Sequence, residues 1–400
     1  MVITTVTIIL VLFAVAMAIP CIVVGVECLI AVIGGADRRA ALEHRGNQRL
    51  AVLIPAHNEQ TCIAATLSTV LPQLRAGDRV LVVADNCTDD TAEQARRAGA
   101  QVVVRHDPHR RGKGYALAYG VQALAADPPQ VVVVIDADTR LLPGSIDALR
   151  DHVSLSEAPA QAVNLLEPPS NPGARDRLSA LAFMVRNLAR PLGLSRLGLP
   201  CPLFGTGMAL PWQALRDAPL ASGNIVEDMQ LGIDLAIGGH PARLCPEARV
   251  MGVLPSGSTD ARAQRTRWEH GHVRTLLTQV PRLLGQALRQ RRLDLLAMAV
   301  DLSVPPLALL VLIWTVLSSL SFLLWWLAGR WEAAAICGCG AASLLCGVLP
   351  AWWRFARQLI PASSLLAVPL YIVWKLPMYL RLFVSPQRQW IRTARPGTAG

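Results

Sequence analysis

The stretch Val131–Thr139 reads VVVVIDADT, and it decides the predicted fold. Four valines and an isoleucine run without interruption into two aspartates, Asp136 and Asp138. An apolar run without alternation is typical of a parallel strand that is buried on both faces. The change of polarity at Asp136 marks the carboxyl end of this strand, the edge where open α/β sheets bind ligands. Two carboxylates there favour a cation between them, such as a divalent metal that carries a diphosphate.

Other short apolar runs alternate with helix-like segments around this stretch. We predict strands at Leu50–Pro55, Arg79–Ala84, Ala100–Val104, Gln130–Ile135 and Ala160–Leu166, and a glycine-rich turn with a strand at Pro200–Leu210. The alternation indicates an α/β domain of Rossmann-like type, with a doubly wound, mostly parallel sheet. Acidic residues follow three of these strands, in AHNE (Ala56–Glu59), DNCTDD (Asp85–Asp90) and DAD (Asp136–Asp138). A nucleotide is therefore expected along these strand ends.

The composition points to a membrane protein with a catalytic domain. The chain has 400 residues and is 52% hydrophobic, and the apolar excess lies in Val2–Ile33 and between Leu293 and Val384. Val2–Ile33 is long enough to cross a bilayer. Arginines follow it and none precedes it, so the positive-inside rule places its N-terminus outside and the next residues in the cytosol. Leu302–Leu327 and Trp331–Trp353 are two further expected spans.

The last apolar run, Ile360–Val384, allows two interpretations. It contains three prolines, Lys375 and Arg381. As a fourth span it would carry the arginine-rich tail outside, against the positive-inside rule, whereas an interfacial amphipathic helix keeps the tail in the cytosol. We favour the interfacial helix. The expected protein is an integral protein of a bacterial-type inner (plasma) membrane, with its catalytic domain in the cytosol.

Three regions follow from these patterns. Residues 1–36 hold the N-terminal transmembrane helix, and residues 48–280 form the cytosolic catalytic domain. Residues 281–400 hold interfacial helices, two or three transmembrane helices and a basic cytosolic tail.

The net charge of +10 comes almost entirely from arginine. Such a charge fits anionic lipid headgroups and phosphorylated substrates, and we discount nucleic acid because no basic-aromatic module of that type occurs. The nine cysteines form no CxxC pair, so neither a disulfide framework nor a zinc site is expected.

Several weaker motifs carry candidate chemistry, and each has a structural alternative. Lys113 in GKG is one of only two lysines and could approach a phosphate, although GKG alone also starts helices. Asp228 in VED could take a proton from an acceptor hydroxyl, but an acid at a helix start also complements the helix dipole. Gln264, Arg267 and Trp268 share one helix face, where Arg267 could stabilise a diphosphate and Trp268 could pack against a sugar ring. The alternative there is a basic interfacial helix.

The DAD motif also allows two other interpretations. It could be a solvated turn at the strand end, without a function. An apolar strand followed by D-x-D-x-T is also how haloacid-dehalogenase-type phosphatases present a nucleophile. That motif normally sits on the first strand of its domain, whereas this one follows three predicted strands.

The order of these motifs is more specific than any one of them. AHNE, DNCTDD, GKG, DAD, FGTG, ED and QRTRW, followed by membrane segments, resemble the membrane-embedded glycosyltransferases of family 2, which include cellulose, chitin and hyaluronan synthases. The resemblance covers Leu50–His272 and implies a GT-A fold.

The resemblance also implies roles for individual residues. The donor, a UDP-sugar, would be bound by the following residues: Pro55, Glu59, Asp85, Lys113, Asp136, Gln264 and Arg267. Asp138 would ligate Mg²⁺ or Mn²⁺ on the diphosphate. The catalytic residues would be Asp228, Glu227 and Arg267, with Asp228 as the base and Arg267 at the leaving group. The acceptor would be bordered by Gly205, Thr206 and Trp268. The segment Trp390–Thr393 resembles a gating segment of some members.

The implied function is inverting transfer of a sugar from a UDP-sugar to a membrane-associated acceptor, in the synthesis of a cell-envelope polysaccharide, oligosaccharide or glycolipid. Two features depart from the family pattern. Val226 stands where the T-E-D motif has threonine, and three or four membrane helices are few for a polymer channel. A processive synthase that exports its polymer through oligomers or partner subunits is the alternative within this class. A catalytically silent membrane scaffold is the alternative from another class, and a transporter is disfavoured because no inverted repeat is visible.

Overall fold

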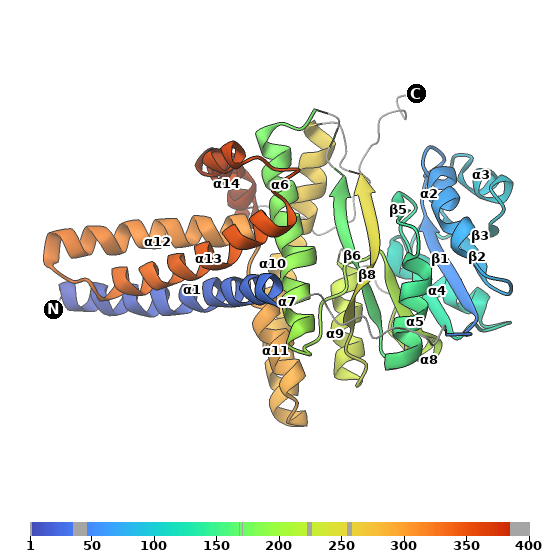
Figure 1. Cartoon of the computed structure of the whole chain (residues 1–400), viewed down its shortest axis with the longest axis horizontal. Helices are drawn as coiled ribbons and strands as arrows, with labels where there is room; N and C mark the ends of the chain where they lie inside the picture. The colour runs from blue at the N-terminus through green and yellow to red at the C-terminus, as the bar shows by residue number, and fades with distance from the viewer. Residues whose placement is uncertain are drawn as a thin grey trace. The chain divides into compact units, whose positions relative to one another are not determined.

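The computed structural model describes residues 2–34, 46–167, 169, 171–221, 226–253 and 258–384. By Cα proximity the chain divides into two units. The helical unit comprises Met1–Asp37, Ser170–Gly198 and His272–Gln387, and the α/β unit comprises Arg38–Pro169, Leu199–Gly271 and Arg388–Gly400. Each unit is described by itself below (Figure 1). The division into residues 1–36, 48–280 and 281–400 stays a prediction.

One sheet of eight strands organises the α/β unit, in the order β3-β2-β1-β4-β7-β6-β8-β5. The strands are β1 (Leu50–Ala56), β2 (Arg79–Asp85), β3 (Gln101–Arg105), β4 (Val131–Val134), β5 (Thr139–Leu141), β6 (Ala160–Glu167), β7 (Met208–Pro211) and β8 (Arg243–Val253). The pairs of β1 with β2, β1 with β4, β2 with β3 and β6 with β8 are parallel. The predicted mostly parallel α/β sheet is confirmed.

Two strands, β5 and β8, were not predicted, whereas β7 lies in the predicted turn and strand at Pro200–Leu210. β5 has three residues and pairs antiparallel with β8, while β7 pairs antiparallel with β4 and β6. β8 carries Pro246 and Glu247, and its register against β6 jumps from Cys245 to Arg249 between neighbouring residues of β6. The extra residues form a bulge, which breaks the alternation that would mark a strand in the sequence.

Both faces of the central strands are buried. The helices of this unit are α2 (Ile63–Val70), α3 (Thr91–Arg97), α4 (Lys113–Leu124), α5 (Ser145–Ser156), α8 (Trp212–Arg216), α9 (Glu227–Ile237) and the first part of α10 (Ser258–Gln290). Val131 and Val133 pack with Ile146 and Leu149 of α5, while Val132 packs with Leu117 of α4. The uninterrupted apolar run of β4 follows from this two-sided burial, because each fully buried valine gains about 1.5–3 kcal/mol.

The register brings the acidic strand ends together. Ala56 pairs with Ala84, Leu53 pairs with Val134, and Asp85 pairs with Arg105. The strands β1, β2 and β4 therefore end at one edge of the sheet.

The helical unit contains four helices that are long and apolar enough to cross a membrane. Its elements are α1 (Val2–Ile33), α6 (Ala174–Met184), a π-helical segment (Val185–Ala189), α7 (Arg190–Arg196), the rest of α10, α11 (Leu293–Leu302), α12 (Leu307–Ala328), α13 (Glu332–Phe355), a 3₁₀ segment (Ala362–Ala367) and α14 (Val368–Val384). The helices α1, α12 and α13 run side by side (Figure 1). Length and composition count Ala362–Arg381 as the fourth candidate span.

The pair of α1 and α13 depends on small residues. A Cβ atom on Gly347 would lie 2.4 Å from the carbonyl oxygen of Gly25, and one on Gly25 would lie 2.2 Å from Oγ of Ser343. Small residues let two membrane helices approach closely enough for their backbones to touch.

Arg190 of α7 also holds this unit together, because it donates to Glu27 of α1 at 2.6 Å and to Asp301 of α11 at 2.5 Å. All three side chains are buried.

We predict that Gly347→Ala destabilises the helical unit by about 1–3 kcal/mol, because its methyl group meets backbone atoms that cannot move independently. Gly338→Ala on the same helix is the matched control, since a Cβ there meets nothing within 4 Å. Alanine favours a helix over glycine by about 1 kcal/mol, so the control should be neutral or stabilising. Thermal unfolding of the detergent-purified variants measures both, and equal midpoints for the two would contradict the close approach.

Candidate functional site

Lys113 joins two strand-end segments of the α/β unit. It is the first residue of α4, and Gly112 before it has φ +128°, a conformation that glycine adopts without strain. The ammonium of Lys113 forms an ion pair with the carboxylate of Asp136, just beyond β4. It also donates a hydrogen bond of 2.7 Å to the carbonyl oxygen of Gly205. The predicted donor-side lysine and the FGTG turn therefore meet at the DAD motif.

Buried polar groups hold the FGTG turn against β4. The backbone N–H of Asp136 donates to Oγ1 of Thr206 at 3.1 Å. The fully buried side chain of Gln161 donates to the carbonyl of Thr206 at 2.9 Å and accepts from the N–H of Phe204 at 2.9 Å. Thr206 is itself buried, and its contact with an acceptor stays a prediction. Gln161 was not identified from the sequence, since a lone glutamine in an apolar strand carries no pattern.

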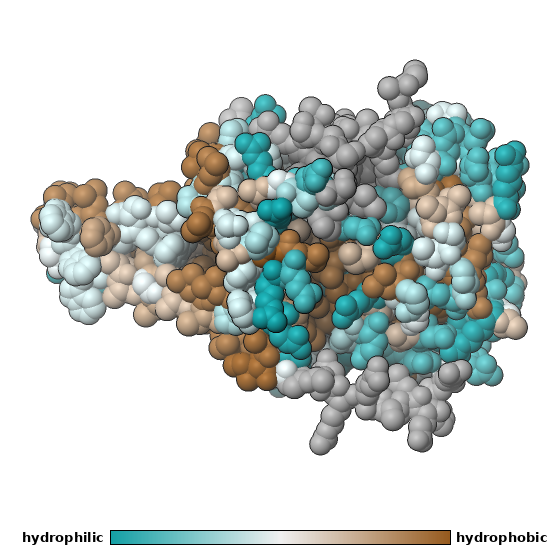
Figure 2. Space-filling view, turned by 45° about the horizontal axis from the view of Figure 1, so that its top comes forward, coloured by the Kyte–Doolittle hydropathy of each residue, from teal (hydrophilic) through white to brown (hydrophobic). Residues whose placement is uncertain are grey.

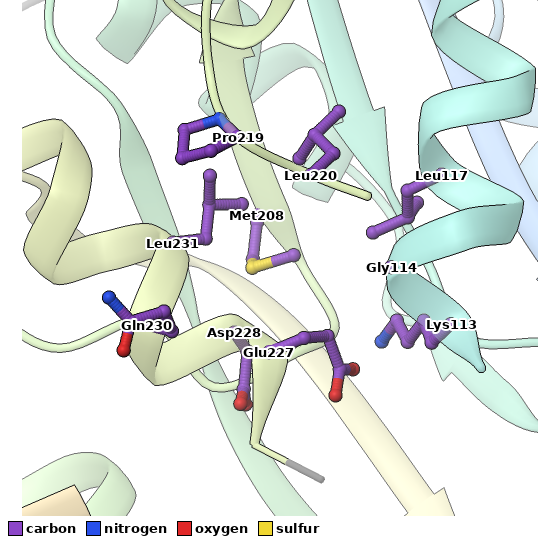
Figure 3. A pocket seen from close by; sticks show the side chains of 10 residues that line it. All are labelled: Lys113, Gly114, Leu117, Met208, Pro219, Leu220, Glu227, Asp228, Gln230 and Leu231. Atoms are coloured by element: carbon purple, nitrogen blue, oxygen red, sulfur yellow. The ribbon is translucent and has the colours of Figure 1, made fainter. Parts of the chain in front are cut away.

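Asp228 and Glu227 face the same place from the start of α9. The two acids and Lys113 line one pocket of about 340 Å³, part of it open to solvent (Figure 3). In this view the carboxyl group of Glu227 points toward Lys113. Gly205 has φ +85°, and a Cβ on it would lie 3.0 Å from Oδ2 of Asp228 and 3.4 Å from Nζ of Lys113. Gly205 therefore sits between the predicted base and the predicted donor lysine.

The charges of this pocket act on one another. Burial disfavours the charged form of Lys113, but Asp136, Glu227 and Asp228 outweigh that effect and raise the pKa of its ammonium. Burial and the neighbouring Asp228 raise the pKa of Glu227 to about 7. Lys113 therefore stays a cation, and Glu227 keeps its proton to nearly neutral pH.

The loops after β1 and β2 interlock at the same edge. Thr88 donates its N–H to Oδ1 of Asn58 at 2.7 Å, and Glu59 donates its N–H to Oγ1 of Thr91 at 2.7 Å. The carboxylate of Glu59 accepts from the thiol of Cys62 at 3.1 Å. Pro55, one residue before the end of β1, is half-buried. These contacts order the predicted nucleoside-binding segment.

Asp85 has a partner that the sequence did not reveal. Its Oδ1 accepts from Arg105, the last residue of β3, at 2.6 Å, and both side chains are buried. Arg105 also donates to Asp107 at 3.1 Å and lies over the ring of Tyr115. The guanidinium fixes the orientation of Asp85, so a ligand there would meet a pre-oriented carboxylate. Its role in binding the donor stays a prediction.

Asp138 lies, partly exposed, in the turn between β4 and β5. Among the described residues, no group of three or more His, Cys, Asp and Glu side chains could hold a metal ion. Mg²⁺ commonly takes one or two carboxylates and completes its coordination with substrate phosphates and water. Because Asp136 is paired with Lys113, Asp138 fits such a site, in which the substrate supplies further ligands.

The predicted QRTRW motif lies on α10, which confirms the helix. The side chains of Gln264 and Arg267 lie outside the described ones, as does the whole segment Trp390–Thr393. Trp268 is half-buried. Three residues further on, a Cβ on Gly271 would lie 2.8 Å from Cγ1 of Val226, so α10 packs against the residue that precedes Glu227 and Asp228.

Comparison with known proteins shows the family to which the chain belongs. Residues 47–271, more than half of the chain, match the family described as Glycosyltransferase like family 2. The chain belongs to this glycosyltransferase family. Membership confirms the predicted family and enzyme class, and it removes the phosphatase reading of the DAD motif.

Individual relatives match shorter stretches. An uncharacterised glycosyltransferase of Mycobacterium bovis is 45% identical over 97 residues, which is 24% of this chain and 38% of the relative. Glucosyl-3-phosphoglycerate synthase of Mycobacterium tuberculosis is 34% identical over 100 residues, 24% of this chain and 30% of the relative. The aligned stretches thus span only 38% and 30% of the length of these curated relatives.

One solved structure resembles nearly the whole chain. A mannosyltransferase from Pyrobaculum calidifontis, in complex with GDP-Man and Mn²⁺, gives a TM-score of 0.54 at 20% identity and covers 96% of this chain and 100% of that chain. At this identity the likeness shows the fold alone, and it confirms the predicted GT-A fold with additional helices.

We predict that Gly205→Ala lowers kcat/KM by about 100-fold, because the added Cβ would lie 3.0 Å from Oδ2 of Asp228 and would shift the predicted base. Gly239→Ala is the matched control. Its φ of +96° imposes a similar backbone strain, but its Cβ meets nothing within 4 Å. Both variants should lose about 1 kcal/mol of stability, and only Gly205→Ala should lose turnover. Equal activities for the two would show that Gly205 matters for its backbone conformation alone.

Proposed function

We propose that this chain is an inverting glycosyltransferase that moves a sugar from a nucleoside diphosphate sugar, a UDP-sugar, to a hydroxyl of a membrane-associated acceptor. The convergence of Lys113, Asp136, Gly205 and Asp228 carries the proposal. A Cβ on Gly205 would meet both the ammonium of Lys113, which pairs with Asp136, and the carboxylate of Asp228, so a leaving group and an attacking hydroxyl could be served in one pocket.

The donor would lie along the ends of β1, β2 and β4. Glu59 and Asp85 suit the hydroxyl and N–H groups of a nucleoside, because carboxylates only accept hydrogen bonds when ionised. Lys113 would lie beside the diphosphate, where it offsets negative charge. We propose uridine as the nucleoside because these motifs resemble those of the family. GDP-mannose is included in the tests because the structurally similar mannosyltransferase was solved with it.

A divalent ion belongs to this proposal. Mg²⁺ or Mn²⁺ at Asp138 would neutralise charge on the diphosphate as the sugar departs. The Pyrobaculum mannosyltransferase was solved with Mn²⁺. Arg267, with Gln264 beside it on α10, would stabilise the same leaving group through a bidentate contact.

Asp228 would accept the proton of the attacking hydroxyl. Burial and the neighbouring Asp228 raise the pKa of Glu227, and Asp228 is assigned as the base because it matches the base of the family motif and lies next to Gly205. A single displacement on an α-linked donor gives a β-linked product. Gly205, Thr206 and Trp268 would border the acceptor, with Trp268 offering a flat apolar surface.

We predict that Asp228→Asn lowers kcat by about 100-fold or more while the dissociation constant of the donor stays within about twofold. Glu227→Gln is the control, since it keeps the size and neutral form of the neighbouring residue. The assay incubates purified protein with UDP-sugars, GDP-mannose and membrane lipids, with Mg²⁺, Mn²⁺ or EDTA, and sizes the product by mass spectrometry.

Different results of this assay overturn different parts of the proposal. Wild-type turnover by Asp228→Asn would refute the base, and full activity in EDTA would refute the metal. Transfer from GDP-mannose but from no UDP-sugar would show that the donor nucleotide is GDP rather than UDP. Products with many added sugars would favour the processive synthase, while an absence of affinity for every donor would favour the silent scaffold.

The membrane position completes the proposal. α14 packs on α6 through a polar face, because the hydroxyls of Tyr371 and Ser179 lie 3.0 Å apart and Arg175 lies over the ring of Trp374. Lys375 on that face is only 4% exposed. The opposite face exposes leucines such as Leu370 and Leu380. These features favour an interfacial helix over a fourth span.

We predict that the C-terminus lies in the cytosol together with the α/β unit. A green fluorescent protein fused to the C-terminus should fluoresce in bacterial cells, and an alkaline phosphatase fusion should stay inactive. Active phosphatase would make α14 a fourth span.

A further inference from the structure

The second half of α10 exposes an apolar stripe. Leu277, Pro281, Leu284 and Leu288 follow the spacing i, i+4, i+7 and i+11, which places them on one face of the helix. All four are exposed, and Leu288 is 81% exposed. Leu283 and Ala287 are buried, so the exposed stripe is separate from the face that packs on the protein.

α11 continues the pattern. Leu293, Leu296 and Val300 follow the spacing i, i+3 and i+7, and all are exposed, Leu293 by 79%. On the other side of this helix, Leu295 and Met298 are buried. The helix therefore has one apolar face toward the protein and a second apolar face that the described chain leaves uncovered.

Arginines border this surface. Arg274, Arg282, Arg289 and Arg291 are all exposed. Residues 272–304 contain five arginines and two aspartates. Both aspartates are ion-paired, Asp294 with Arg292 at 2.5 Å and Asp301 with Arg190 at 2.5 Å. The surface is therefore both apolar and positively charged.

The rest of the helical unit indicates what covers this surface. In Figure 1, α11 runs across the common direction of α1, α12 and α13, the three helices that lie side by side. Figure 2 shows apolar side chains gathered where those helices leave the body of the helical unit. A helix that lies across the direction of membrane spans, with leucines on one face and arginines along its border, matches the boundary between acyl chains and headgroups.

We propose that the surface formed by α10 from Arg274 onward and by α11, the α10–α11 face, binds a bilayer surface that contains anionic phospholipid. The leucines enter the acyl boundary, and the guanidinium groups bind lipid phosphates, for which their paired N–H donors are suited. Each arginine near an anionic surface shifts such an equilibrium about fivefold. This binding does not depend on the transfer reaction.

The test places a fluorescent amino acid, sensitive to its surroundings, at position 288 or 290 of the full-length protein. Both positions are exposed in the last turn of α10 but point in nearly opposite directions. The protein is reconstituted into vesicles of phosphatidylcholine, with or without phosphatidylglycerol. With phosphatidylglycerol, the emission at 288 should shift to the blue and be quenched by brominated lipid, while position 290 stays open to aqueous iodide.

A charge variant separates lipid charge from apolar burial. The combined variant Arg282→Gln, Arg289→Gln and Arg291→Gln should abolish the difference between the two vesicle types, as should high salt. Equal lipid quenching at 288 and 290 would overturn the proposal, as would an unchanged signal on adding phosphatidylglycerol. Shielding of position 288 that rises with protein density in the membrane would instead assign the surface to a second copy of this chain.

Discussion

The ion pair of Lys113 with Asp136, together with the hydrogen bond from the same ammonium to Gly205, connects the parts of this site. The three residues come from the start of α4, the end of β4 and the turn before β7. Asp228 lies beside them at the start of α9, since a Cβ on Gly205 would meet both its carboxylate and the ammonium of Lys113. One cation thus offsets the negative charge of the acidic side chains around it, which are Asp136, Glu227 and Asp228.

That cluster depends on the sheet below it. Because β4 is buried on both faces, a charged side chain has no place in it before Asp136. The strands β1, β2 and β4 end together, and the loops that follow them bind one another through Asn58, Thr88 and Thr91. The proposed transfer site therefore lies at the edge of the sheet, where the buried apolar strands end.

Much of this was predictable from the sequence, for a physical reason. The VVVVI run requires two-sided burial, and the acidic residues after β1, β2 and β4 mark strand ends that share one edge. Arg105 and Gln161 could not be predicted, since each acts on residues far from it in the sequence, Arg105 on Asp85 and Gln161 on the turn around Thr206. The bulge of β8 and the contact of Gly347 with Gly25 were equally hidden, because they depend on how elements far apart in the sequence approach each other.

The most direct test of this account is the kcat/KM of Lys113→Met for the sugar donor, measured beside the wild type and checked for folding by circular dichroism. Methionine keeps an unbranched side chain that is one atom shorter, and it removes the charge that binds Asp136 and Gly205 and lies near Asp228. The account predicts a folded protein whose kcat/KM falls by about 100-fold or more. A folded Lys113→Met variant with wild-type kcat/KM would contradict it.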